Sequence, residues 1–361
     1  MSARAIANLH LFDGERIISD SWVVIDGVIR DFGQGEGWKK YVGSPEDGSG
    51  KFLTPKLIDT HAHGAVGFSN DNGLEHMLKV IDFYKSNGVG KTFLSLISAP
   101  IEQMVTIIGV AHEIEDPAFL GLHLEGPFLA EEFKGAHDQQ VLHAPTDLEL
   151  DQIISASKGI VKSMTIAPEL FTSQQLEKLK AAGIEPCFGH SAANYSQAKE
   201  FFGSVGKIMT HAFNAMQSIH HRAAGPIPAA LEAAAFTELI ADGEHVHPEA
   251  ARLLNPEKVI LVTDSMAATG MPDGDYKLGS MDVRVVDSVA RTHGGSIAGS
   301  TLLLTKAVQN YAGWISDPAA AFKAATTNPA IAYGLDEPKL DAGSNSWLLW
   351  DTELNLEEQG S

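Results

Sequence analysis

The sequence contains a single cysteine, Cys187, among 361 residues. One thiol cannot form a disulfide within the chain, and this scarcity is compatible with the reducing environment of the cytoplasm. Cys187 lies in an apolar run, so we expect it to pack in the core as a small hydrophobic side chain. Stabilisation by an intramolecular disulfide is therefore excluded.

Basic residues are also few. The chain has 26 lysines and arginines against 46 aspartates and glutamates, which gives a formal net charge of −20 at pH 7. This balance argues against nucleic acid or an anionic membrane as a partner, because either would need a basic face on the protein. It leaves open a small anionic substrate, provided that a few basic residues gather in one pocket.

Long apolar runs and nucleotide-binding loops are absent as well. No segment reaches the roughly 20 apolar residues needed to cross a bilayer, and the first residues, MSARAIANLH, lack the apolar core of a signal peptide. No GxGxxG motif follows the first expected strand and no Walker-type loop occurs, so nucleotide binding by those devices is not supported. These absences predict a cytoplasmic protein.

The two ends of the chain have short β-like patterns. The run WVVIDGVIRDF places Asp26 and Gly27 between two apolar segments, a strong hairpin signal, and no helix is evident before Thr54. Near the C-terminus, SWLLWD at 346–351 is another strand candidate. We therefore predict a small β-sandwich domain formed by residues 1–53 together with 336–361. Within it, the Gly-, Ser- and charge-rich stretch 34–50 is expected to be an exposed loop.

Between these ends, strand-like runs alternate with helical patterns. Leu74–Ser86 and Ser173–Ala182 repeat apolar residues at spacings of three and four, and a glycine follows each of them, as at helix ends. Eight runs have the character of strands: 56–60, 91–97, 119–124, 163–167, 184–189, 207–210, 237–241 and 258–263. Eight strands alternating with helices favour a (β/α)8 TIM-like barrel over residues 54–335 rather than a doubly wound sheet.

Candidate ligand residues follow several of these runs. FLGLHLEGPF ends a buried strand at Glu125, and LIDTHAHG places His61 and His63 on one face of an extended segment. The other candidates are His190 in FGHS, His211 in THAFNAM and Asp264 in LVTDS. Barrel enzymes build their sites at the carboxyl ends of strands, so these side chains are expected to converge. Alone, Glu125 could be a buried carboxylate paired with a lysine or arginine, and any one histidine could be a core residue.

The same segments carry a resemblance that covers nearly the whole chain. They are similar to the motifs of the amidohydrolase superfamily and, within it, of the N-acetylglucosamine-6-phosphate deacetylases. The similar segments are IDTHAHG (58–64), GLHLEGPF (121–128), KGAHD (134–138), TIAPE (165–169), GHS (189–191), THAFNAM (210–216), ADGEHV (241–246), LVTDSM (261–266) and AGS (298–300). The resemblance implies a metal-dependent hydrolase.

This resemblance implies the metal ligands. In the family, the residues similar to Glu125, His190 and His211 hold a catalytic divalent metal, and the pair similar to His61 and His63 can support a second one, although some members lack it. We expect Zn, with Fe, Mn or Co as alternatives, in one tight site and a second, weaker one. A metal with three protein ligands keeps an open position for water and lowers its pKa towards about 7.

The resemblance also implies the residues around the substrate. The aspartate similar to Asp264 handles protons, and the histidine similar to His137 in KGAHD helps to polarise the acetyl carbonyl. Without the resemblance, the Gly- and charge-flanked position of His137 indicates an exposed loop histidine. Asn214 and Ala215 are similar to a segment that contacts the substrate.

Phosphate recognition is implied for two further residues. Arg222 in HHRAAGP is similar to the arginine that meets the sugar phosphate from the neighbouring subunit of a dimer, so we expect a homodimer. A guanidinium fork suits phosphate geometry. His245 in ADGEHV is similar to a second residue on the phosphate side. The chain departs from the family pattern at Ala223–Ala224 and at Ser265–Met266, which leaves the loop shape, and hence the sugar preference, open.

The resulting prediction is a hydrolase that removes acetate from N-acetylglucosamine-6-phosphate in amino-sugar catabolism. One alternative is deacetylation of a related substrate, either N-acetylgalactosamine-6-phosphate or an N-acyl amino acid. Another is a non-catalytic family member that binds sugar phosphates. That alternative would be expected to have lost Asp264 or a metal ligand, and none is missing.

Overall fold

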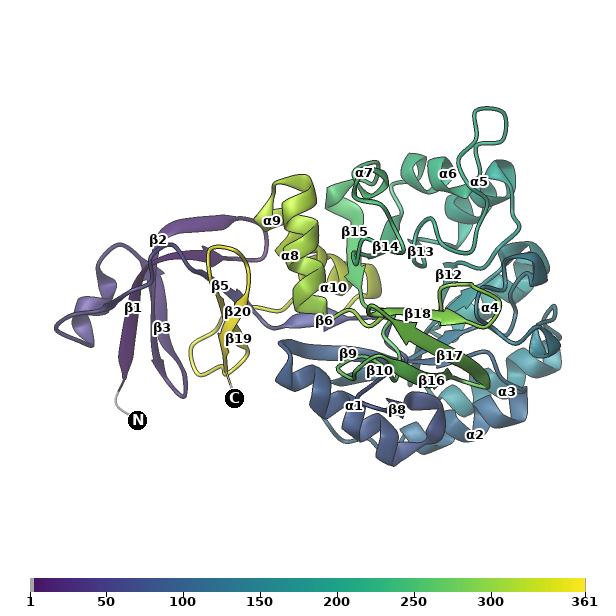
Figure 1. The fold of residues 1–361 in the computed structure, drawn as a ribbon, viewed down its shortest axis with the longest axis horizontal. Coiled ribbons are helices and arrows are strands. Elements are labelled where there is room, and N and C mark those ends of the chain that lie inside the picture. The colour runs from purple at the N-terminus through teal and green to yellow at the C-terminus, as the bar shows by residue number, and fades with distance from the viewer. Residues whose placement is uncertain (1–2, 361) are drawn as a thin grey trace.

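The computed structural model describes residues 3–360 and has two parts (Figure 1). The larger part is a barrel of parallel strands surrounded by helices. The smaller part is a sheet whose strands come from both ends of the chain. The predicted combination of a (β/α)8 barrel with a small β domain formed by both termini is confirmed, and the strands of that domain pair in one sheet rather than in the two sheets of a sandwich.

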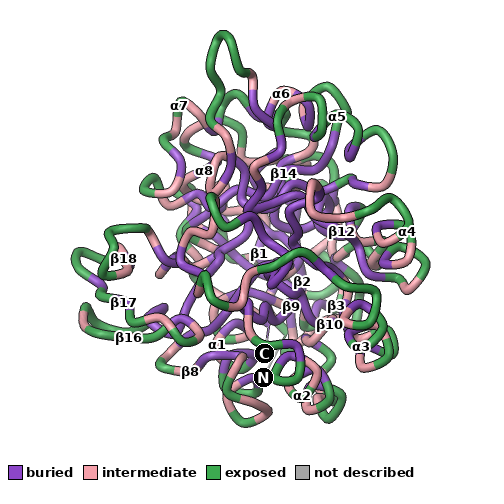
Figure 2. The backbone as a smooth tube through the Cα atoms, turned by 90° about the vertical axis from the view of Figure 1, so that its right-hand side faces the viewer, coloured by how far each residue is buried: buried purple, intermediate pink, exposed green. Residues whose placement is uncertain are grey.

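Eight parallel strands form the barrel, in the same order as in the chain. They are β6 (Leu57–Asp59), β9 (Val89–Ile97), β10 (Phe119–Glu125), β11 (Val161–Ile166), β12 (Glu185–Phe188), β13 (Ile208–Met209), β14 (Phe236–Ile240) and β15 (Val259–Val262). Each coincides with or overlaps one of the eight predicted runs. The strands are buried in the centre of the molecule (Figure 2), because helices cover their outer face and side chains fill the interior. Cys187 is buried on β12, as predicted.

The barrel closes between its first and last strands. Just beyond β6 and β15, the backbone N–H of Asp264 donates to the carbonyl of His61 at 2.8 Å. Closer to the two strands, at the preceding residue Thr263, the side-chain Oγ1 donates to Asp59 Oδ2 at 2.7 Å. Burial raises the pKa of Asp59 to about 7, against hydrogen bonds from Thr263 and His61 that lower it. The closure between β6 and β15 therefore places the candidate site residues His61 and Asp264 side by side.

The helices pack around the barrel (Figure 1). Three begin with capping boxes, at Thr146, Thr172 and Asn194, which satisfy free N–H groups of the first turn. The α-helices are α1 (Leu74–Ser86), α2 (Ile101–Ala111), α3 (Asp147–Ser157), α4 (Ser173–Ala181), α5 (Tyr195–Ser204), α6 (Pro226–Glu232), α7 (Pro248–Ala251), α8 (Leu304–Ile315), α9 (Pro318–Ala324) and α10 (Thr327–Tyr333). Short 3-10 helices span Gly37–Lys40, Asn70–Asn72, Glu131–Phe133, Gln139–Val141, Pro168–Leu170 and Pro256–Lys258. Within residues 3–360, none of the helices has both the length and the apolar character needed to span a membrane.

The smaller part is one sheet of seven strands in the order β20-β19-β5-β1-β2-β3, with β4 paired to β1. The strands are β1 (Arg4–Phe12), β2 (Ile17–Asp26), β3 (Val28–Gln34), β4 (Glu46–Asp47), β5 (Phe52–Pro55), β19 (Trp347–Trp350) and β20 (Leu356–Gln359). The predicted hairpin turns at Gly27, whose φ of +71° suits glycine. The expectation of no helix before Thr54 is wrong for one turn, the 3-10 helix Gly37–Lys40, because a single turn has no apolar periodicity to reveal it.

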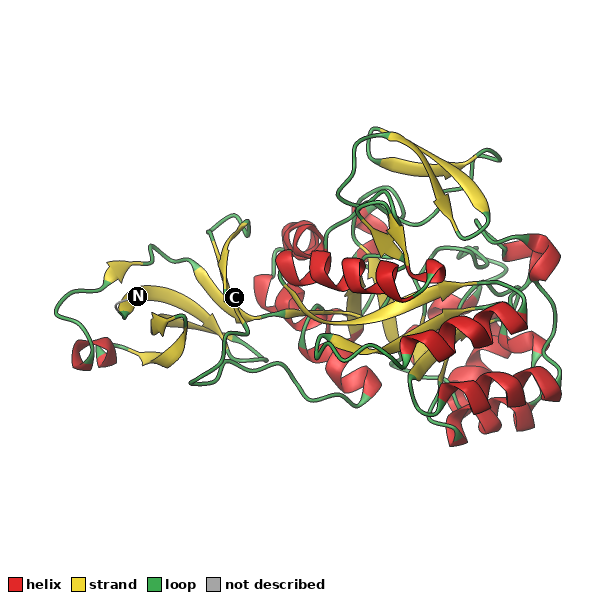
Figure 3. Cartoon of the chain, turned by 90° about the horizontal axis from the view of Figure 1, so that it is seen from below, coloured by secondary structure: helices red, strands yellow, loops and turns green. Residues whose placement is uncertain are grey.

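A second small sheet, which the sequence analysis does not predict, is inserted between β15 and α8. Its antiparallel strands are β16 (Gly274–Leu278), β17 (Met281–Val286) and β18 (Val289–Thr292), and Figure 3 shows them projecting from one side of the barrel. Val283 and Val285 on β17 are buried against Ile97 at the end of β9. The short β-hairpin β7 (Gly64–Ala65) and β8 (Phe68–Ser69) follows the first barrel strand.

Candidate active site

Glu125 lies at the carboxyl end of β10 and is the centre of the site. Its Oε1 is 3.1 Å from His190 Nε2 and 3.0 Å from His211 Nε2, and the two nitrogens are 3.1 Å apart. Both histidines follow their strands with φ in the left-handed region, +46° at His190 and +23° at His211. Such backbone costs energy in residues other than glycine and is concentrated at functional sites. The structure thus brings together the three predicted ligands.

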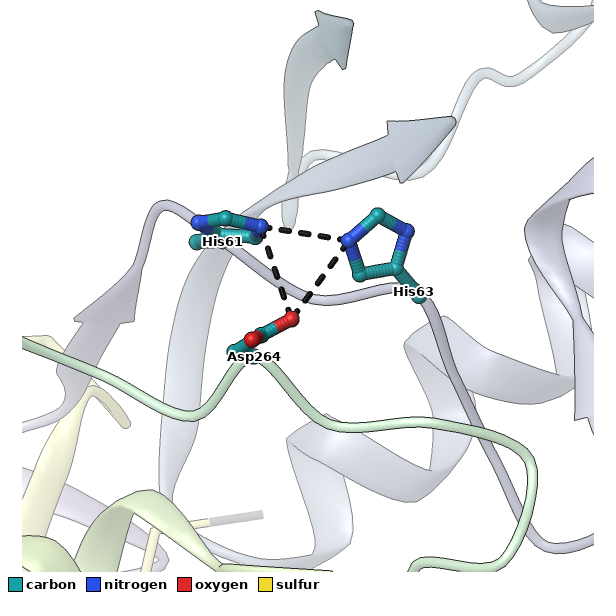
Figure 4. Close-up of side chains that lie close together, drawn as sticks. All are labelled: His61, His63 and Asp264. Atoms are coloured by element: carbon teal, nitrogen blue, oxygen red, sulfur yellow. Dashed lines mark hydrogen bonds and ion pairs between the residues drawn. The ribbon is translucent and has the colours of Figure 1, made fainter. Parts of the chain in front are cut away.

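The second predicted group lies directly beside the first. His61 Nε2 and His63 Nε2 are 3.1 Å apart, and each is 3.5 Å from Asp264 Oδ1 (Figure 4). His63 Nε2 is also 3.1 Å from Glu125 Oε2. Asp264 has a φ of +47° at the end of β15. The carboxylate of Glu125 therefore lies between the two groups and has one oxygen near each.

The hydrogen bonds on the outer side of these rings fix where their lone pairs point. His190 Nδ1 lies 2.7 Å from the carbonyl oxygen of Phe133, which can only accept, so the proton of the neutral ring is on Nδ1. His61 Nδ1 is likewise 3.2 Å from a carboxylate oxygen of Glu238. The Nε2 lone pairs of both rings then face the oxygens of Glu125. Lone pairs that converge on a carboxylate need a cation between them.

The spacing of these atoms also fits a metal. Ligands about 2.1 Å from a tetrahedral ion are about 3.4 Å from one another. Three atoms at 3.0–3.1 Å, on Glu125, His190 and His211, come close to this arrangement. Within residues 3–360, the buried Nδ1 atoms of His63 and His211 have no hydrogen-bond partner.

Burial and the neighbouring ionisable groups shift the pKa values of the site residues in opposite directions. Burial alone would raise the pKa of Glu125, but its interactions with the imidazole of His137 and, after it, with those of His190 and His211 bring this pKa well below its usual value. Burial alone would lower the pKa of His61, but Asp264, Glu125 and Glu238 raise it well above its usual value. No lysine or arginine in residues 3–360 forms an ion pair with Glu125, Glu238 or Asp264. A carboxylate-rich site without basic side chains suits a divalent cation.

His137 is not an exposed loop residue. The loop after β10 folds back and buries it, with Nε2 3.3 Å from Glu125 Oε2 and Nδ1 2.8 Å from Ser98 Oγ. Burial lowers the pKa of His137 to about 4, against the attraction of Glu125, so the ring is neutral at pH 7. The interpretation based on flanking residues alone was therefore wrong, and the one drawn from the resemblance placed it in the site.

A cavity of about 290 Å³ opens over these groups. Its wall includes all the predicted site residues except His61, His63 and Arg222, together with part of the inserted sheet and the loop after it. The lining residues are Glu125, His137, His190, His211, Asn214, Ala215, His245 and Asp264, with Gly135, Ala136, Leu278, Ser296, Ile297 and Gly299. His245 is oriented by Asp242, whose Oδ2 lies 2.6 Å from its Nδ1. The cavity is large enough for a small polar molecule.

Arg222 lies away from this cavity, on the exposed loop between β13 and α6. His220 and Ala223 pair across the tip of that loop, which projects beyond α5 and α6 in Figure 1 and is exposed in Figure 2. The structure of one chain therefore does not bring Arg222 to Glu125. The other departure from the family pattern is buried: Ser265 Oγ donates to the carbonyl of Gly64 at 3.1 Å.

Three residues that support the site were missed by the sequence analysis: Ser98, Glu238 and Asp242. Ser98 comes directly after β9, so its place at a strand end was a usable signal. Asp242 stands three residues before His245 in ADGEHV, a spacing at which a side chain can reach back. Glu238 is a lone carboxylate inside the apolar strand β14, where a buried charge calls for a partner.

The chain is similar to known proteins over most of its length. Residues 52–344 match the amidohydrolase family. The chain is 34% identical over 298 residues to the N-acetylgalactosamine-6-phosphate deacetylase of Escherichia coli O157:H7, covering 79% of each chain. It is 35% identical over 295 residues to the N-acetylglucosamine-6-phosphate deacetylase of Vibrio furnissii, covering 78% of this chain and 74% of the relative.

The fold of the chain is also similar to that of a solved structure. The N-acetyl-D-glucosamine-6-phosphate deacetylase of Mycobacterium smegmatis, an aspartate-to-alanine mutant in complex with N-acetyl-D-glucosamine-6-phosphate, superposes with a TM-score of 0.88 and 29% identity. The match covers 99% of this chain and 97% of that one. On the extent of the sequence match and the shared architecture, the chain belongs to the amidohydrolase family.

Proposed function

We propose that the chain hydrolyses the N-acetyl group of N-acetylglucosamine-6-phosphate to give glucosamine-6-phosphate and acetate in amino-sugar catabolism. The observation that carries the proposal is the convergence of His190 Nε2 and His211 Nε2 on Glu125 at the cavity wall, beside Asp264. The named relatives supply the substrate class.

Two sets of residues would hold divalent metal. Glu125, His190 and His211 would form the tight site, and His61 and His63 a weaker one that shares Glu125 and lies against Asp264. A bound divalent ion supplies an activated water and a Lewis acid for the amide carbonyl. Zn is the expected ion, and Fe, Mn and Co fit the same imidazole and carboxylate donors.

The remaining steps belong to the side chains around the cavity. Asp264 accepts the proton of the attacking water and returns it to the departing amine. His137 can polarise the acetyl carbonyl through Nε2 only if that atom carries the proton. The hydroxyl of Ser98 must then donate to Nδ1 instead of to the carbonyl of Glu125, which it reaches at 2.9 Å. Asn214 and Ala215 would position the sugar, and His245 would contact the phosphate.

Acetate release is the test of this proposal. The metal-loaded protein would be assayed with N-acetylglucosamine-6-phosphate, N-acetylgalactosamine-6-phosphate and an N-acyl amino acid. The galactosamine epimer is the second candidate, because one relative at 34% identity carries that name. We expect the highest kcat/KM for the glucosamine compound. A higher value for the epimer would reverse the assignment, and no release from any of them would leave a protein that only binds sugar phosphates.

Arg222 is expected to recognise the phosphate from the neighbouring subunit of a homodimer. Arg222→Ala should weaken binding of N-acetylglucosamine-6-phosphate by roughly 1.5–3 kcal/mol, the contribution of a charge-assisted hydrogen bond, and leave N-acetylglucosamine unaffected. KM for both substrates measures this. Arg16→Ala is a matched control, because Arg16 is also exposed but lies in the turn between β1 and β2. Equal weakening for both substrates would make Arg222 a structural residue.

Mixing Asp264→Asn with Arg222→Ala tests whether Arg222 acts across the dimer, with activity measured at a substrate concentration far below KM, where neither variant alone turns over appreciably. A heterodimer of Asp264→Asn and Arg222→Ala chains has one complete site if each site takes its arginine from the partner. In a twofold-symmetric dimer, half of the dimers in a random mixture are heterodimers, and each heterodimer has one working site of its two. About a quarter of the wild-type activity should therefore return. No recovery would indicate that each chain uses its own arginine or that no dimer forms.

The number of ions is expected to depend on the HxH pair. A His61→Asn/His63→Asn variant should keep one tightly held ion and lose the weaker one, because Glu125, His190 and His211 are unchanged. Metal analysis after equilibration with excess Mn²⁺ and brief desalting compares the two proteins. If both hold the same number of ions, His61 and His63 are not a site.

A further inference from the structure

Glu238 is a buried carboxylate that the mechanism above does not use. It lies in the middle of β14 and is 2% exposed. Its Oε2 is 3.2 Å from His61 Nδ1, and its Oε1 accepts a hydrogen bond of 3.2 Å from the hydroxyl of Tyr333 at the end of α10. A chain of contacts thus runs from an outer helix through β14 to a ring in the centre of the site.

We propose that Glu238 is a positioning residue that holds His61 with its proton on Nδ1 and its Nε2 lone pair directed at the second metal position. This inference rests on the proposed function for the presence of divalent ions at the site. It predicts that Glu238 controls how tightly the second ion binds and has little effect on the first.

The geometry around the ring supports this role. His61 packs edge-on against His123, with ring centroids 4.4 Å apart, and it stacks on His211 at 5.7 Å. These contacts fix the plane of the ring but do not choose which nitrogen is protonated. That choice falls to the partner of Nδ1, and Glu238 is a pure acceptor when ionised. A carboxylate behind a ligating histidine is a common way to fix its tautomer and strengthen its bond to the metal.

The charges support the same conclusion. Glu125, Glu238 and Asp264 are three buried carboxylates around His61, and none of them has a lysine or arginine partner within the described residues. One divalent ion brings two positive charges against three negative ones, so one negative charge is left without compensation. Buried charges are normally paired or bind metal, and a second cation removes the deficit. Glu238 thus contributes to the second site through charge as well as orientation.

Replacing Glu238 with glutamine tests the proposal, because the amide keeps the shape and removes the charge. Metal-free protein would be titrated with Mn²⁺, with bound metal measured by equilibrium dialysis and the paired ions by electron paramagnetic resonance. In Glu238→Gln we expect the tight ion to be retained and the Kd of the second to rise about 10–100-fold, the usual effect of losing such a partner. The signal of the coupled Mn²⁺ pair should disappear at concentrations that saturate the wild type.

Glu185→Gln is the matched control. Glu185 is also a buried carboxylate on a barrel strand, but it begins β12, at the end of the barrel away from the site, and pairs with Lys180 at 2.7 Å. It should change neither Kd. An unchanged second Kd in Glu238→Gln would overturn the proposal, as would equal loss of both ions or a wild-type protein that holds one ion in excess Mn²⁺. The titration uses no substrate, so a failed deacetylase assay would overturn the proposed function without affecting this result.

A measurement on the unmodified protein covers the case in which Glu238→Gln does not fold. In zinc-loaded protein with 15N-labelled histidine, nuclear magnetic resonance distinguishes the ligating nitrogen from the protonated one. We expect His190 and His61 each to give a signal with a ligated Nε2 and a protonated Nδ1, and the His61 signal is identified by its loss in His61→Asn. Ligation of His61 through Nδ1 would overturn the proposal.

Discussion

Replacing Asp264 with asparagine is expected to lower turnover a hundredfold or more while the tight metal stays bound. The amide cannot accept a proton from the attacking water or return one to the amine, and losing a positioned acid and base has effects of this size. Asp264 is 3.5 Å from both His61 and His63 but is not among the ligands of the tight site. The measurements are kcat with N-acetylglucosamine-6-phosphate and the metal content of the purified variant.

The fold should tolerate this change. The backbone of Asp264 helps to close the barrel, since its N–H donates to His61 and its carbonyl accepts from Ser300 at 2.7 Å, and asparagine keeps both bonds. Asparagine also adopts the left-handed backbone that Asp264 requires. Asp287→Asn is the control, because Asp287 has a similar φ of +52° on an exposed turn. Turnover close to wild type in Asp264→Asn would remove the aspartate from the mechanism.

The barrel and the convergence of ligands could be predicted because they depend on local patterns. A parallel strand covered on both faces is apolar along its length, so runs such as 259–262 stand out between amphipathic helices. Once eight such strands close, their carboxyl ends meet at one rim. Glu125, His190 and His211 follow three different strands, and their proximity is a consequence of that closure.

What could not be predicted depends on contacts between distant segments. Tyr333 and Glu238 are 95 positions apart and meet only because α10 packs against the barrel. The burial of His137 depends on a loop that folds back, and no periodicity encodes that path. The inserted strands β16–β18 left a trace in the alternating run MDVRVV, in which valines at 283 and 285 are buried and their neighbours exposed. Their role as part of the cavity wall, through Leu278, appears only in three dimensions.

Glu125→Gln is expected to have the largest effect on metal and activity together. The side chain of Glu125 lies within 3.3 Å of four histidine Nε2 atoms, those of His63, His137, His190 and His211. Glutamine fills the same space without the negative charge, so the tight ion loses its one anionic ligand while two neutral imidazoles remain. Turnover should fall by about a thousandfold or more, since the metal contributes several kcal/mol to stabilising the transition state.

Restoring metal separates this prediction from a general loss of structure. Wild-type protein treated with a chelator should lose activity and regain it when Zn²⁺ or Mn²⁺ is added back, because its ligands are intact. Glu125→Gln should stay inactive at the same metal concentration and hold less than one ion per chain. Glu131→Gln, on the exposed 3-10 helix of the following loop, is the control and should behave like the wild type. If Glu125→Gln recovered full activity on addition of metal, the imidazoles alone would suffice to bind the catalytic ion, and the central position of Glu125 would have to be explained by its contacts with the histidines.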